Sequence, residues 1–376
     1  MNIKQEFCLN PEVTYLNHAA VAPWPIRTRQ AVQQFADENA QQGSLRYLEW
    51  LKLEDDLRVK LAQLINAPSK NTVALLKNTS EALSIVAYGL DWQAGDNVVI
   101  SDQEFPSNRI IWESLNDKGV EVRQIDLGSG ATPESALLAA IDDKTRLLSV
   151  SSVQYASGLR MQLEILGEYC KAHNVLFCVD AIQSIGAVEF DVQAINADFV
   201  MADGHKWMLG PEGLALFYCR PELYEQISLH QFGWHMVEHV GDFDRREWQP
   251  ASNARRFECG SPNMLAIHAL HESISLLLET GMQIVEAEVL ARSEAIMAAV
   301  NNATSLELVS DTTAGRYAGI VSFRHREIPS KNLYERLFNQ GVFCADRGNA
   351  IRFSPHFYTE MSKIYTAVRL AATAIL

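Results

Sequence analysis

The sequence predicts an α/β protein whose large domain has a mostly parallel seven-stranded sheet, followed by a smaller C-terminal α/β domain. Two observations predict this class. Between residues 72 and 218, short β-branched or apolar runs alternate with amphipathic segments, which is typical of βα units on a sheet that helices cover on both faces. The chain has 376 residues, which is enough for more than one domain.

The elements are expected in the following order. An extended, proline-interrupted arm precedes residues 28–64, which show helical periodicity. Seven runs with strand character then follow at 72–77, 97–101, 121–127, 145–153, 176–179, 199–202 and 213–218. Only a short turn separates the last two runs, so we expect an edge hairpin or a local reversal there.

Beyond residue 220 the alternation of strand-like and helical segments ends. Residues 229–255 form an irregular connection rich in Trp, His and Phe, and long connections in compact domains are often functional. The remaining expected elements are helices 263–278 and 286–303, strand 319–324, helix 330–339, strands 342–345 and 350–354, and helix 359–376. We therefore predict an arm (1–25), a large domain (26–255) and a small domain (256–376).

Composition excludes several classes of function. The net charge is −14, without a run of five like charges, which argues against nucleic acid or an anionic membrane as partner. The six cysteines form no CxxC pair and no His/Cys cluster, so neither a metal site nor a disulfide framework is expected. No signal peptide and no apolar stretch of about eighteen residues is present, so a cytoplasmic location is expected.

Lys206 is the first candidate for chemistry, because it follows an apolar run and precedes a glycine-containing turn. A desolvated lysine can lose its proton and form an imine with a carbonyl cofactor. An ordinary surface lysine at a strand end is the alternative. Since ligands of open α/β sheets bind at the carboxyl ends of strands, the residues that follow the other runs decide between the two.

Polar and aromatic residues do follow these runs. Thr79 and Ser80 lie within a capping-box spacing, where a helix N-terminus can hold a phosphate or be a plain N-cap. Phe105 can stack on a flat ring or pack into the core. Asp180 can pair with a pyridinium nitrogen or cap a helix, and Gln183 can donate to a phenolate oxygen. Together with Lys206 they match the needs of pyridoxal 5′-phosphate (PLP).

These residues carry a family resemblance that extends over nearly the whole chain. The chain resembles the class V aminotransferase family of PLP-dependent enzymes, which includes cysteine desulfurases, kynureninases and isopenicillin N epimerase-like proteins. The matching motifs are Tyr15-Leu16-Asn17-His18-Ala19-Ala20, Asn78-Thr79-Ser80-Glu81-Ala82, Glu104-Phe105-Pro106-Ser107-Asn108, Val179-Asp180-Ala181-Ile182-Gln183-Ser184, Gly204-His205-Lys206-Trp207 and Phe257-Glu258-Cys259-Gly260-Ser261-Pro262-Asn263. The resemblance implies the type I fold of PLP-dependent transferases.

The resemblance also implies roles for single residues. Lys206 would hold PLP as an imine and move the substrate's α-proton. Asp180 would pair with the pyridine nitrogen, and Gln183 with the ring oxygen. Phosphate binding is implied for Thr79, Ser80 and His205.

Further implied roles concern stacking, the substrate and a second subunit. Phe105 resembles the ring-stacking residue of the kynureninase-like loop, where desulfurases carry histidine. Arg352 resembles the arginine that binds the substrate α-carboxylate, and Ser152 stands where desulfurases have an asparagine near the substrate. Ser261 matches a residue that reaches the phosphate from the neighbouring subunit, which implies a homodimer with shared active sites. Asp203 replaces a phosphate-binding serine; because an acid would repel a phosphate dianion, we expect it to point elsewhere, toward the backbone.

The chain departs from desulfurases at the expected nucleophile. Only ten residues separate Gly341 from Arg352, which leaves no room for the loop that carries a catalytic cysteine. Cys344 falls inside an expected strand and is typical of a core residue.

The resulting hypothesis is a PLP-dependent enzyme that deprotonates Cα of a small α-amino acid, with transamination, Cβ–S lysis or epimerisation as open outcomes. One alternative is a cysteine desulfurase with a non-standard nucleophile. The other is a non-catalytic PLP-binding protein.

Overall fold

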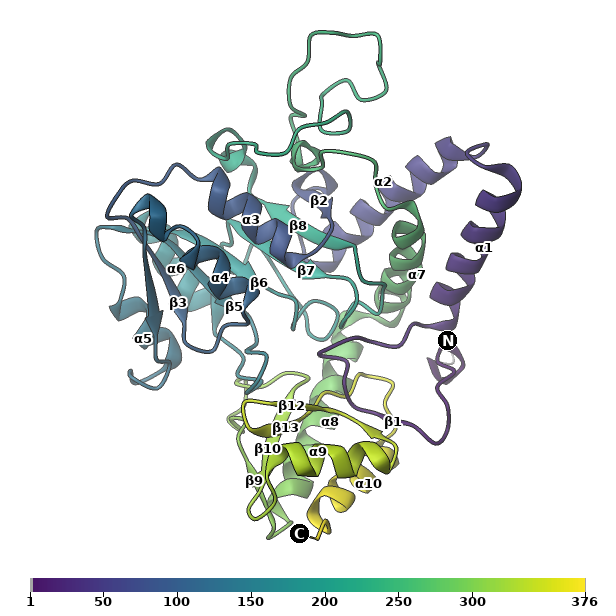
Figure 1. Ribbon diagram of the computed structural model, residues 1–376, viewed down its shortest axis with the longest axis vertical. Coiled ribbons are helices and arrows are strands. Elements are labelled where there is room, and N and C mark those ends of the chain that lie inside the picture. Colours follow the sequence, from purple (N-terminus) through teal and green to yellow (C-terminus); the bar gives the residue numbers. More distant parts are fainter. Residues whose placement is uncertain (1–2, 376) are drawn as a thin grey trace.

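The computed structural model describes residues 3–375. Residues 1, 2 and 376, which begin the predicted arm and end the predicted final helix, lie outside the described residues. Figure 1 shows a large α/β layer structure above a smaller group of strands and helices that contains the C-terminal part of the chain. No described helix is both long and apolar enough to cross a lipid bilayer.

The large sheet contains all seven expected strands. They are β2 (Val73–Leu76), β3 (Asn97–Ser101), β4 (Glu121–Ile125), β5 (Thr145–Ser151), β6 (Leu176–Asp180), β7 (Phe199–Asp203) and β8 (Ala215–Cys219). Their order is β2-β8-β7-β6-β5-β3-β4, and β8 runs antiparallel to both of its neighbours. The expected local reversal is therefore confirmed, whereas the expected edge hairpin is wrong, because β2 pairs with the outer side of β8.

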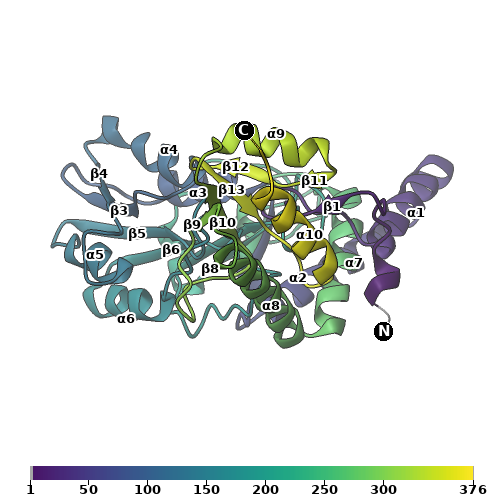
Figure 2. The same cartoon turned by 90° about the horizontal axis from the view of Figure 1, so that it is seen from below.

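Helices cover both faces of this sheet, as Figure 2 shows. One face carries α3 (Thr79–Gly89) and α4 (Ser107–Glu113), and the other carries α5 (Pro133–Ala139) and α6 (Leu163–His173). Successive strand residues point to opposite faces, so Val98 packs into the α3–α4 core and Val99 into the core of the other face. Because both faces are buried, β2, β3, β6, β7 and β8 are buried along nearly their whole length, whereas the edge strand β4 keeps exposed polar residues.

The N-terminal helical segment forms two helices. They are α1 (Ile26–Gln42) and α2 (Tyr47–Leu64), and α7 (Met264–Thr280) packs against both. The break follows from Gly43, whose φ of 58° is a conformation that favours glycine.

The small domain has a four-stranded antiparallel sheet of order β12-β13-β10-β9. Its elements are α8 (Met282–Asn301), β9 (Leu306–Leu308), β10 (Val321–His325), α9 (Ser330–Asn339), β12 (Ala345–Arg347), β13 (Ala350–Phe353) and α10 (Met361–Ala372). The expected strand 342–345 is divided between β12 and β11 (Val342–Phe343), and β11 pairs in parallel with β1 (Thr14–Tyr15). The arm is thus attached to the small domain, which the sequence pattern did not indicate; β9 and β1 were not expected either.

Short 3₁₀ helices complete the described chain: η1 (Ile3–Glu6), η2 (Lys70–Thr72), η3 (Asn116–Lys118), η4 (Pro221–Gln226) and η5 (Ala254–Phe257). The segment between η4 and η5 is the expected irregular connection, and it projects from the large domain at the top of Figure 1.

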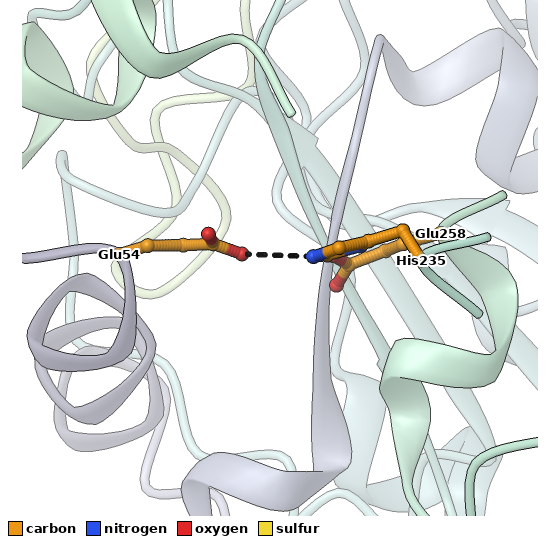
Figure 3. Close-up of side chains that lie close together, drawn as sticks. All are labelled: Glu54, His235 and Glu258. Atoms are coloured by element: carbon orange, nitrogen blue, oxygen red, sulfur yellow. Dashed lines mark ion pairs between the residues drawn. The ribbon is translucent and has the colours of Figure 1, made fainter. Parts of the chain in front are cut away.

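A buried charge cluster fixes the base of this connection to α2. Arg58 donates to the carboxylates of Glu54 and Glu258, with an Nη2–Oε2 distance of 2.8 Å to Glu258. The Leu75 amide donates to the other oxygen of Glu258 at 2.8 Å. The ring of His235 lies 4.0 Å from Glu54 and 3.5 Å from Glu258, and Figure 3 marks its contact with Glu54. These groups could hold a metal by their spacing, but the guanidinium already supplies the positive charge, so we assign the cluster a structural role.

Candidate active site

A cavity of about 260 Å³ opens at the carboxyl ends of β6 and β7, next to the N-terminus of α3. Eight of the ten predicted site residues line it: Thr79, Ser80, Phe105, Asp180, Gln183, His205, Lys206 and Arg352. Its wall also includes residues 19–21 of the arm, Asp203 and Glu212 of the large domain, and Arg347 of the small domain. The cavity thus uses side chains from both parts of the molecule, which only the folded chain brings together.

Lys206 and Asp180 form the charged centre of the cavity. Burial lowers the pKa of Lys206 to about 8, although the nearby carboxylate of Asp180 opposes this shift. Asp180 is 2% exposed, and burial raises its pKa. Its Oδ1 accepts a hydrogen bond from the Ile182 amide at 3.1 Å, and no other hydrogen bond to this carboxylate occurs among the described residues. Asp180 therefore retains an acceptor for a cationic or N–H group in the cavity.

The start of α3 forms the anion-binding end. Asn78 is the N-cap and accepts a hydrogen bond from the Glu81 amide at 2.9 Å, as its spacing predicted. The Ser80 amide remains as a donor for a phosphate at this first turn, and the Ser80 hydroxyl, which donates to Ser107, can be redirected to it, whereas the amide and hydroxyl of Thr79 already donate to Asp203. His205 lies beside them, and its Nδ1 is buried without a partner among the described residues. Burial lowers the pKa of His205 to about 4.

Asp203, the last residue of β7, contacts the backbone of α3, as expected, but it also lines the cavity. Its Oδ2 accepts hydrogen bonds from the amide and from the hydroxyl of Thr79, both at 3.2 Å. Burial raises the pKa of Asp203, while these hydrogen bonds oppose the shift.

An aromatic ring and an amide border the centre of the cavity. Phe105 is 42% exposed, and its ring centroid lies 5.7 Å from Nζ of Lys206. Gln183 is buried; its Nε2 donates to the Ala19 carbonyl at 3.1 Å, and its Oε1 accepts from the indole of Trp207 at 2.8 Å. Since an amide nitrogen has two hydrogens, one donor of Gln183 remains for a ligand.

Arg352 brings a guanidinium from β13 into the cavity. It is 2% exposed and donates to the Tyr155 carbonyl at 2.8 Å, and its Nε has no partner among the described residues. Burial lowers the pKa of Arg352 to about 10, and the nearby Arg347 contributes to this shift. Sequence reasoning missed Arg347; its position five residues before Arg352 in one hairpin was the available signal.

Two predicted site residues lie outside this cavity. Ser152 is buried behind Asp180, where its hydroxyl lies 2.6 Å from that of Ser184 and 3.3 Å from the Asp180 carbonyl oxygen. Ser261 lies in a neighbouring groove together with Lys77 and Gly213. Ser152 therefore stabilises the end of β6, and Ser261 is available to another molecule.

No cysteine lines the cavity within the described chain. Cys344 is 3% exposed in the core of the small domain, and burial raises its thiol pKa to about 12. A thiol of this kind is a poor nucleophile, because the thiolate is the reactive form.

The donor set fits PLP. The imidazole of His205 and the α3 N-terminus suit its phosphate, and Asp180 suits a protonated pyridine nitrogen. Lys206 supplies an amine for the aldehyde, and Phe105 offers an aromatic ring for the pyridine face.

Comparisons with known proteins point the same way. The sequence profile of the family described as Aminotransferase class-V matches residues 14–369. A probable cysteine desulfurase of Methanothermobacter thermautotrophicus is 29% identical over 96% of this chain and 95% of its own length. A cysteine desulfurase of Yersinia pestis is 29% identical over 84% of this chain and 76% of its own length.

Solved structures share the fold. The apo cysteine desulfurase of Thermococcus onnurineus has a TM-score of 0.85 at 23% identity and covers 95% of this chain and 93% of its own. The cystine C–S lyase C-DES, in complex with cysteine persulfide, has a TM-score of 0.88 at 23% identity and covers 96% of this chain and 98% of its own.

Proposed function

This chain belongs to the class V aminotransferase family and is a PLP-dependent enzyme, and we propose that it eliminates a sulfur leaving group from Cβ of an α-amino acid. The observation that carries the proposal is one cavity lined by Lys206, Asp180 and Arg352 and, within the described chain, by no cysteine. Lys206, Asp180 and Arg352 serve the deprotonation of Cα in a bound amino acid. The missing thiol disfavours transfer of sulfur to the enzyme itself.

Substrate binding uses the small domain. The guanidinium of Arg352 can donate two parallel hydrogen bonds to the α-carboxylate, and burial strengthens this charge-assisted contact. Because Arg352 also donates to the Tyr155 carbonyl, its head is held in place before substrate arrives.

Proton transfer uses the large domain. The pKa of Lys206, lowered by burial to about 8, leaves a usable fraction of neutral amine near neutral pH, so Nζ can take the α-proton and later return it. PLP, when bound, supplies an electron sink for the pair left at Cα. Asp180 keeps the pyridine nitrogen protonated through its free acceptor, which the protein hides from water.

The β-elimination then balances as follows. The Cα–H bond and the Cβ–S bond break, the sulfur leaves as thiol or sulfide with one proton, and water converts the remaining enamine to pyruvate and ammonia. No nucleophilic side chain is required for these steps.

A second candidate is a cysteine desulfurase with a non-standard nucleophile, which the names of the relatives at 29% identity favour. The two reactions have different products. A desulfurase converts cysteine to alanine and leaves a persulfide, whereas the lyase releases pyruvate, ammonia and a sulfur product.

The test is a product panel on the purified, PLP-loaded protein with cysteine, cystine and other amino acids. Pyruvate with stoichiometric ammonia supports the proposal, and alanine with protein-bound persulfide refutes it in favour of the desulfurase. A keto acid formed only with an amino acceptor would show transamination, and the D-enantiomer would show epimerisation. No spectral change with any amino acid would favour a non-catalytic PLP-binding protein.

We also propose a homodimer with shared active sites. It is supported by the position of Ser261 in a groove beside its own subunit's cavity, where it is available to a partner. Mixing Ser261→Ala with Lys206→Ala protein tests this directly, because only shared sites change the PLP affinity of the hybrid dimers.

A further inference from the structure

Two buried polar atoms face each other at the phosphate end of the cavity without a partner. They are Oδ1 of Asp203 and Nδ1 of His205, 3.9 Å apart, and neither makes a hydrogen bond within the described chain. Buried polar atoms are rarely left unpaired, so such a pair needs an explanation.

The other oxygen of Asp203 is already committed. Oδ2 accepts from the amide and the hydroxyl of Thr79, so the carboxylate is anchored to the first residue of α3. Asp203 is 7% exposed and cannot turn into solvent. Its orphaned oxygen therefore stays directed at His205.

The phosphate end lacks a permanent cation. Apart from His205, its described donors are groups of Thr79 and Ser80 at the start of α3, all uncharged, and those of Thr79 already donate to Asp203. The carboxylate of Asp203, whose Oδ1 has no hydrogen-bond donor within the described chain, would repel a phosphate dianion. A proton on His205 would remove this conflict, because the imidazolium has two N–H donors, one for each anion.

We propose that Asp203 is the positioning residue of the phosphate site, which accepts a hydrogen bond from Nδ1 of His205 and so holds this ring as the imidazolium that binds the cofactor phosphate. The inference rests on the proposed phosphate site but not on the proposed reaction, so the failure of either leaves the other open to its own test.

The arrangement links cofactor binding to a proton. In the free protein His205 is neutral at neutral pH, because burial lowers its pKa to about 4. In the complex two anions flank the ring, so binding takes up a proton, and the affinity for the phosphate decreases as pH rises. The other charged groups lining the cavity are Lys206 and Glu212 of the same turn region, Asp180 of β6, and Arg347 and Arg352 of the small domain.

The test is calorimetry on the apoprotein, in buffers of different ionisation enthalpy at pH 7.5. The probes are 4′-deoxypyridoxine 5′-phosphate, which has no aldehyde, and the same compound without phosphate. The phosphate-free probe reports any proton taken up at the pyridine nitrogen. We expect the phosphorylated probe to take up close to one additional proton per site, and this wild-type measurement needs no variant. Equal uptake for the two probes would overturn the proposal.

Variants sharpen the assignment. Asp203→Asn keeps an acceptor for Thr79 but cannot stabilise an imidazolium, so the phosphorylated probe should bind about 10- to 100-fold more weakly, without the additional proton. The phosphate-free probe should bind as before. His205→Gln should weaken binding of the phosphorylated probe to the same extent. The double variant should bind this probe as tightly as either single variant does, because each substitution already removes the same Asp203–His205 interaction.

The matched control is Asp198→Asn at the opposite end of β7, where a buried aspartate accepts from the Phe177 amide at 2.8 Å. It should leave the proton uptake unchanged. Additive losses in the double variant, or equal weakening of both probes by Asp203→Asn, would show that Asp203 acts only by anchoring α3 and would refute the positioning role.

Discussion

Replacing Arg352 by glutamine tests the substrate assignment most directly. The guanidinium is 2% exposed, so its contact with a carboxylate would not be screened by solvent. A charge-assisted hydrogen bond contributes about 1.5–3 kcal/mol, and an arginine makes two to a carboxylate. Glutamine keeps at most one neutral donor, so the loss is about 3–4 kcal/mol. We therefore expect kcat/KM for amino acids to fall about 10²- to 10³-fold.

The same substitution should do little to the free protein. Arg352 forms no ion pair within the described chain, and the nearby Arg347 and burial both lower its pKa. Its removal relieves an uncompensated buried charge, which offsets the lost hydrogen bond to Tyr155. We expect the free energy of unfolding in urea to change by less than about 1 kcal/mol.

The assay is a spectral titration of the PLP-loaded protein, combined with product formation. Cysteine should bind far more weakly to the variant, whereas cysteamine, which lacks the carboxylate, should bind the variant and the wild type alike. Arg326→Gln, an exposed arginine of the small domain, is the matched control. A loss below tenfold for cysteine, or an equal loss for cysteamine, would refute the carboxylate role of Arg352.

Three further outcomes are expected. Because a lowered pKa of about 8 leaves Lys206 neutral above that pH, borohydride-trapped attachment of PLP to the apoprotein should accelerate from pH 7 to 9 and be absent in Lys206→Ala; a flat profile contradicts the shift. Cys344→Ser should retain full product formation, and loss of sulfur release would revive the desulfurase reading. A Cβ on Gly319 would lie 2.2 Å from the indole of Trp207. Gly319→Ala should therefore lower the free energy of unfolding in urea by about 1–3 kcal/mol. Gly260→Ala should leave it unchanged, because the space around Gly260 is open.

The sequence alone was sufficient for the large sheet and for most of the cavity. Strands that are buried between helices can be recognised in a sequence as apolar runs, and all seven predicted strands of the large sheet are present. Parallel strands end at a common edge, so residues placed after the runs, such as Asp180 and Lys206, could be expected to meet. The family motifs then gave these positions consistent roles, and eight of the ten candidates line one cavity.

The remaining features depend on contacts between distant parts of the chain, which local patterns do not encode. An apolar run does not specify its neighbour, so the insertion of β8 between β2 and β7 and the pairing of β1 with β11 came only from the fold. The sequence does not say which side of a strand end faces the cavity, because this depends on how the neighbouring strands pair. Ser152 is an example, since its hydroxyl contacts the Asp180 carbonyl behind the cavity.

The charges around the site show the same division. Sequence identified Asp203 as an acid in the wrong place, because an aspartate near a phosphate is repulsive by charge alone. Only the tertiary structure brings its orphaned oxygen to 3.9 Å from the orphaned nitrogen of His205 and anchors its other oxygen to Thr79. The types of residue at the strand ends were determined by the sequence, whereas the partners of each side chain were decided by packing, since burial and distance set both charge and hydrogen bonding.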